Sequence, residues 1–107
     1  MERRGSIRYP LRLPVRIVAV GGEVVSIPAQ TSNISCTGVL LRCGADFAEG
    51  QPVEYVIGLY SDYNLRLRGK GKIERTTKAS QPSPDNSGPF TVALTLDTFE
   101  FIREAGG

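Results

Sequence analysis

The chain contains no histidine and no tryptophan among its 107 residues. Histidine is the usual general acid or base near neutral pH and the commonest metal ligand in proteins. Its absence, together with the lack of Asp or Glu pairs at a suitable spacing, argues against an enzyme and against a zinc site. The sequence therefore predicts no catalytic residue, no bound metal and no cofactor, and it favours a binding or structural protein.

Cysteines are also scarce, with only Cys36 and Cys43 present. They form no Cys-x-x-Cys pattern and are too few for a disulfide framework, so reduced thiols in a cytoplasmic protein are the preferred interpretation. A single disulfide between them is the alternative.

Long hydrophobic runs are missing too. No segment approaches the roughly 18 apolar residues of a membrane span, and the start, MERRGSIRYP, is basic without an apolar stretch of signal-peptide length. We therefore expect a cytoplasmic protein, or a cytoplasmic module of a longer one, that does not insert into membranes.

A large excess of charge is lacking, because 13 Lys and Arg against 11 Asp and Glu leave a formal net charge of +2. This value argues against a general nucleic-acid binder. The positive residues nevertheless cluster at the start and in a later segment: Arg3, Arg4, Arg8, Arg12 and Arg16, then Arg66, Arg68, Lys70, Lys72, Arg75 and Lys78. Local clusters of this kind fit a small anionic ligand better than a long polyanion.

The residues that are abundant indicate a turn-rich β protein. The chain is 40% hydrophobic, with 12 Gly and 7 Pro, and its β-branched residues recur in short groups. Strands are predicted at 13–19, 23–30, 38–42, 52–59, 65–76 and 90–96, with Gly21-Gly22 as a hairpin turn. Gly69 and Gly71 inside one strand predict a bend or a close approach of another group.

These strands predict an all-β fold, a small antiparallel six-stranded β-barrel that leaves no exposed sheet edge. Residues 1–107 form a single domain in this prediction. It has a flexible Arg-rich N-terminal arm (1–11), the barrel (12–97), and at most one short C-terminal helix or tail (98–107).

The most unusual local feature is the polar hexapeptide Asn33-Ile-Ser-Cys-Thr-Gly38, which runs directly into an apolar strand. One interpretation is a turn stabilised by Asn33 or Ser35, with Gly38 supplying backbone freedom. The other is a ligand site, in which Asn33 and Ser35 are short hydrogen-bonding groups and Gly38 lets a ligand approach the backbone.

The arginines of the arm also allow two interpretations. Arg3, Arg4 and Arg8 could belong to a solvated basic tail. They could instead clamp a ligand, because guanidinium groups pair bidentately with phosphate, stack on flat rings and donate to the O6 and N7 atoms of guanine.

The order of the two motifs, ERRGSIR and then NISCTG after a β-hairpin, resembles the PilZ domain family, whose members bind the bacterial second messenger cyclic di-GMP. The segments RYPLRLPVRI, LRGKGKIERT and TVALTLDTFEF resemble the first and later strands of that family, so the likeness covers nearly the whole chain. Many members have Asp where this chain has Asn33.

The resemblance implies that Arg4 and Arg8 grip phosphates and guanine rings, with Arg3 as a third such residue. It implies that Asn33, Ser35 and Gly38 hold the other guanine against the barrel. The arm would become ordered over the bound ligand and so change the activity of an unidentified effector protein or fused domain.

Other functions remain open. A PilZ-fold adaptor could act through protein contacts without binding the nucleotide. A generic RNA-binding barrel would bind arbitrary single strands in a salt-sensitive manner. The basic residues of the later strand, Arg66, Arg68, Lys70, Lys72 and Arg75, form either a solvated face or additional phosphate contacts.

Overall fold

The computed structural model describes residues 12–60, 65–79 and 88–103. Seven strands account for most of them: β1 (Pro14–Val20), β2 (Glu23–Ile34), β3 (Gly38–Cys43), β4 (Pro52–Tyr60), β5 (Leu65–Lys78), β6 (Phe90–Thr95) and β7 (Thr98–Arg103). Every predicted strand is present, and β2 continues four residues beyond its predicted end. None of the described segments is a helix with the length and apolarity needed to cross a membrane.

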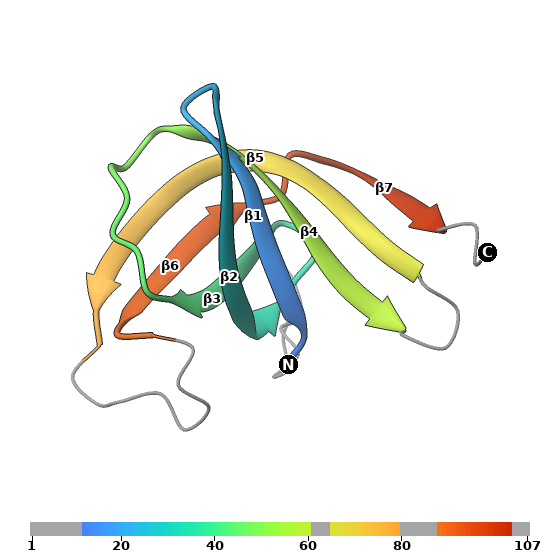
Figure 1. Cartoon of the computed structure of the whole chain (residues 1–107), viewed down its shortest axis with the longest axis horizontal. Helices are drawn as coiled ribbons and strands as arrows, with labels where there is room; N and C mark the ends of the chain where they lie inside the picture. The colour runs from blue at the N-terminus through green and yellow to red at the C-terminus, as the bar shows by residue number, and fades with distance from the viewer. Residues whose placement is uncertain (1–11, 61–64, 80–87, 104–107) are drawn as a thin grey trace, which may run out of the picture.

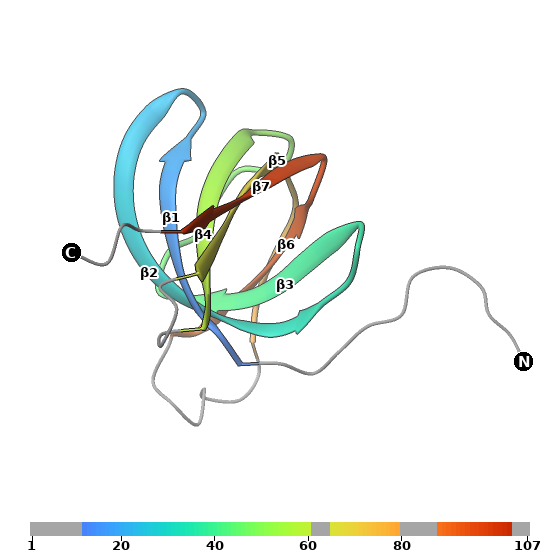
Figure 2. The same ribbon diagram turned by 90° about the vertical axis from the view of Figure 1, so that its right-hand side faces the viewer.

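Six of the strands close into a ring, as Figures 1 and 2 show. β1 pairs with β2 and β4, β2 also pairs with β3, β3 with β6, β6 with β5, and β5 with β4, all antiparallel. Each strand of the ring therefore pairs with a neighbour on both sides over at least part of its length, which satisfies most of its backbone groups. The predicted six-stranded antiparallel barrel is confirmed.

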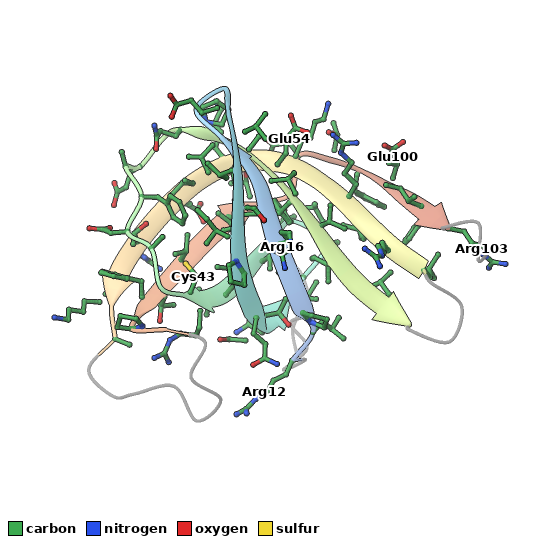
Figure 3. All side chains as sticks on the ribbon, in the orientation of Figure 1. Arg12, Arg16, Cys43, Glu54, Glu100 and Arg103 are labelled. Atoms are coloured by element: carbon green, nitrogen blue, oxygen red, sulfur yellow. The ribbon has the colours of Figure 1, made fainter. Side chains whose placement is uncertain are left out.

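The core lies inside the ring and consists of alternate side chains. Ile17, Leu41, Tyr55 and Val92 have no solvent exposure. Cys43 is also buried, and burial raises the pKa of its thiol, whose Sγ donates to the carbonyl oxygen of Ala45. Both cysteines are free thiols, with Cys36 exposed; Figure 3 labels Cys43 on the ribbon.

The last strand differs from the prediction. Residues 98–103 form β7 instead of the start of a short helix, and β7 pairs with residues 65–70 of β5. Two physical reasons favour the strand. Thr98, Phe99, Phe101 and Ile102 are β-branched or aromatic. The first half of β5 also has an available edge, because β6 pairs only with residues 73–78.

The two glycines within β5 permit the close approach that the sequence predicted. A Cβ on Gly71 would overlap the carbonyl oxygen of Thr95, where β6 ends against β5. The Thr95 hydroxyl accepts a hydrogen bond from the Lys72 backbone N–H at 2.8 Å, and its carbonyl accepts one from the Tyr55 hydroxyl at 3.0 Å. The end of β6 is thereby fixed on β5, next to the groove described below.

Candidate ligand-binding groove

The polar hexapeptide forms the end of β2 and a tight turn into β3. Ser35 is 8% exposed, and its backbone N–H donates to the carbonyl oxygen of Gly38 at 2.9 Å. Its hydroxyl donates to the same carbonyl and accepts from the Thr37 N–H, both at 3.3 Å. The Ser35 side chain therefore stabilises the turn from within, as one of the two interpretations predicted.

Close packing between two strands, which the sequence did not indicate, explains the glycine at position 38. Its φ is not positive, so the expectation that it supplies unusual backbone freedom is wrong. A Cβ at this position would lie 2.8 Å from the carbonyl oxygen of Leu94 on β6. Only glycine lets β3 and β6 approach this closely without a shift of the backbone.

A groove of about 690 Å³ lies beside this turn. One wall is formed by the turn rim, which we define as Asn33, Ser35, Thr37 and Gly38. The opposite wall is formed by the Arg75 rim, defined as Glu74 and Arg75 of β5. The other lining residues are Val39, Leu40, Ala93, Leu94, Thr95, Leu96 and Asp97. Asp97 lies beside Lys70 of β5 and follows Leu96, whose N–H donates to Thr37 of the turn rim. The volume is typical of a site for a small organic ligand.

Two irregularities in the sheet explain why Asn33 and Arg75 reach the groove. The register of β2 against β3 shifts between Thr31 and Asn33, and that of β5 against β6 shifts between Ile73 and Arg75. A bulge at each point turns the following side chain to the other face of the sheet. Thr31 and Ile73 are buried, whereas Asn33 and Arg75 line the groove.

After these bulges, four residues stand in one row across the outside of the barrel. Asn33 pairs with Leu40, Leu40 with Ala93, and Ala93 with Arg75. Three strand spacings separate the Cα atoms at the ends of this row by about 14 Å. The row gives the groove an apolar floor of Leu40 and Ala93, with a polar residue at each end.

The connection between the N-terminal arm and the barrel is fixed next to the turn rim. The Leu13 N–H donates to the Thr31 hydroxyl at 2.8 Å, and the Thr31 N–H donates to the Leu13 carbonyl at 3.0 Å. Thr31 precedes Asn33 by two residues in β2. The predicted ligand residues Arg3, Arg4 and Arg8 lie outside the described residues, so their positions relative to the groove stay a prediction.

The sequence model of the PilZ domain matches residues 2–87, which include the arm, the turn rim and Arg75. The chain belongs to the PilZ domain family. No curated protein matches the chain in sequence.

A solved structure has the same fold as this PilZ domain. The Bacillus subtilis inhibitor of motility, MotI/DgrA, superimposes with a TM-score of 0.68 over 94% of the chain, at 18% sequence identity. The chain spans 44% of the length of that protein.

The basic residues of β5 fall into separate groups in this PilZ domain. Arg68 forms an ion pair with Glu54 of β4 at 3.0 Å, on an exposed part of the barrel. Arg66 lines a second groove, of about 580 Å³, along β1 and β4, which contains none of the predicted ligand residues. Lys70 and Lys72 are exposed and line neither groove, so Arg75 alone of these residues lines the first.

The carboxylate of Asp97 is close enough to the core to affect Tyr55. Burial raises the pKa of the Tyr55 hydroxyl, and the negative charge of Asp97 raises it further. The sequence offers no reason to expect Asp97 at the groove, and it indicates Arg75 only as one of several basic residues that form either a solvated face or phosphate contacts. Asp97 follows the last strand of the barrel, and the period-two pattern from Leu65 to Ile73 would have placed Arg75 inside the barrel.

Proposed function

We propose that this PilZ domain binds cyclic di-GMP in the groove between the turn rim and the Arg75 rim. The observation that supports the proposal most is that Asn33, Ser35 and Gly38, the residues of the second motif, line one groove next to the base of the arm. Membership of the PilZ domain family supports it as well. The ligand is bound and released unchanged, so the domain acts as a receptor in the cytoplasm and not as an enzyme.

The barrel and the arm make different contributions to this binding. The side-chain amide of Asn33 offers one acceptor and two donors to a guanine edge. Ser35 and Gly38 shape the turn that holds Asn33 in place. Arg3, Arg4 and Arg8 supply the positive charge that two phosphates require, through charge-assisted hydrogen bonds and stacking on the bases.

The arm is long enough for this role. Arg8 lies five positions before Leu13 and Arg4 lies nine positions before it, which allows spans of at most about 18 and 32 Å. Because Leu13 is fixed to Thr31, both arginines are within reach of a ligand in the groove. Ligand binding orders the arm over the groove, and this change is transmitted to an effector protein or a fused domain.

One observation favours a second candidate, an adaptor of the same fold that acts without the nucleotide. Ser35 and Gly38 have structural roles in the turn and against Leu94, so the fold accounts for both residues without a ligand. Arg4 and Arg8 lie outside the described residues, and an adaptor does not require them.

Isothermal titration of the chain with cyclic di-GMP separates these candidates. We expect saturable heat at tens of micromolar, a concentration typical of regulatory affinities. Arg4→Ala, Arg8→Ala and Asn33→Ala should each weaken binding at least tenfold, whereas Arg103→Ala on β7 serves as a matched control and should leave it unchanged. No heat with the wild type would reject the receptor and favour the adaptor. Displacement of the ligand by unrelated single-stranded RNA would favour a generic RNA-binding barrel.

A further inference from the structure

The Arg75 rim carries a mixed set of charges at the edge of the groove. Glu74 and Arg75 are both exposed and both line it. Arg75 forms no ion pair with any of the described residues, whereas Arg68 on the same strand is held by Glu54. The guanidinium of Arg75 is therefore available to a ligand.

The charges of this rim fit a base better than a phosphate. A phosphate near Arg75 would also lie near the Glu74 carboxylate, which repels it. Guanine instead presents two acceptors, O6 and N7, and beside them the donors N1–H and N2–H₂. Arginine pairs bidentately with O6 and N7, and a carboxylate accepts from N–H donors.

The width of the groove indicates which guanine this is. Asn33 and Arg75 stand at opposite ends of the row Asn33, Leu40, Ala93, Arg75, about 14 Å apart at their Cα atoms. One purine is too small to bridge two residues at this separation. A ligand with two guanines can place one at each rim, with its sugar-phosphate ring over the apolar floor between them.

We infer that the Arg75 rim is a second base-recognition site, in which Arg75 donates to the O6 and N7 atoms of one guanine while the turn rim holds the other. This inference rests on the proposed function. The Glu74 carboxylate of the same rim accepts from N1–H and N2–H₂ of that guanine. Arg75 is therefore a specificity-determining residue, distinct from the arginines of the arm.

The test compares two ligands and three proteins by isothermal titration of the full 107-residue chain. The ligands are cyclic di-GMP and its 7-deaza analogue, which lacks the N7 acceptor on both bases but keeps both phosphates. The proteins are the wild type, Arg75→Ala and the control Arg68→Ala. Thermal melting verifies that each variant is folded, which the exposure of both side chains leads us to expect.

We expect Arg75→Ala to weaken cyclic di-GMP binding at least tenfold, about 1.4 kcal/mol. The same substitution should weaken binding of the 7-deaza analogue less than threefold. The variant should therefore prefer cyclic di-GMP over the analogue less strongly than the wild type does. Arg68→Ala should change neither affinity. An equal loss for both ligands would mean that Arg75 contacts phosphate, and an unchanged affinity would mean that it contacts nothing; either result overturns the inference and leaves the proposed function intact. If the wild type binds neither ligand, the proposed function itself fails.

Discussion

The two rims of the groove are built in different ways. The turn rim consists of residues within one hexapeptide, and its hydrogen bonds run between Ser35, Thr37 and Gly38. The Arg75 rim consists of two neighbouring residues of β5 at a bulge against β6, and both side chains are exposed. The first rim is thus preformed by its own backbone, whereas the second depends on how β6 is fixed against β5.

Both rims also lie against β6. The Leu96 N–H donates to the Thr37 carbonyl at 2.9 Å, which joins the turn to the segment that leads to Asp97. Two glycines pack against β6: Gly38 of the turn rim against the Leu94 carbonyl, and Gly71 of β5 against that of Thr95. Substitutions at these supports distinguish a rim that depends on local bonds from one that depends on strand packing.

The largest effect is expected for Gly71→Ala. A Cβ there overlaps a backbone carbonyl that cannot rotate away, so either β6 or β5 must shift. We predict a loss of more than about 3 kcal/mol in the free energy of unfolding, measured by urea denaturation. Gly44→Ala is the control, because a Cβ on Gly44 meets no atom within 4 Å and its φ is not positive. A loss below about 1 kcal/mol at Gly71 would show that the Arg75 rim does not depend on this contact.

Gly38→Ala should have a smaller but clear effect. The added Cβ would lie 2.8 Å from the Leu94 oxygen, a contact that a small displacement of β3 relieves. We predict a loss of about 1–3 kcal/mol, which lowers the melting temperature by several degrees in a domain of this size. The same urea series measures it. A loss equal to that of Gly71→Ala would mean that the two rims are supported alike.

The smallest of the three effects is expected for Tyr55→Phe, below the Arg75 rim. Removing the hydroxyl leaves the Thr95 carbonyl without this donor and should cost about 1 kcal/mol at neutral pH. The variant should also change how stability depends on pH.

The sign of that pH dependence follows from the raised pKa of Tyr55. In the unfolded chain a tyrosine ionises near its ordinary value of 10.0, while burial and the charge of Asp97 keep the proton on Tyr55 in the folded barrel. The stability linked to this proton is fully present below pH 10 and is lost as the pH rises above it. Between about pH 9 and 11, the free energy of unfolding should therefore fall less in Tyr55→Phe than in the wild type. Identical losses in the two proteins would contradict this account of Tyr55.

The sequence was sufficient for those parts of the fold and of the site that depend on local patterns. Alternation identified the strand β1, Gly21-Gly22 identified the hairpin turn after it, and the NISCTG hexapeptide identified a candidate site. Each of these signals lies within a few consecutive residues. The glycines of β5 correctly indicated a close approach, although not that the approaching group is Thr95.

The remaining features depend on contacts between distant segments. A bulge moves the later side chains of a strand to the opposite face of the sheet. No residue type near Asn33 or Arg75 predicted the bulges that precede them. Strand β7 forms because β5 has an edge that β6 leaves unpaired, which is a property of the assembled barrel. The packing role of Gly38 likewise depends on Leu94, far along the chain.

A titration of the chain with cyclic di-GMP, followed by the NMR signals of its backbone amides, tests whether the ligand lies between the two rims. This position of the ligand predicts that signals of the turn rim and of the Arg75 rim shift together and saturate at the same ligand concentration, while Val56 and Gly58 in the second groove do not shift. Shifts centred on the second groove, or none at a saturating concentration of ligand, would contradict it.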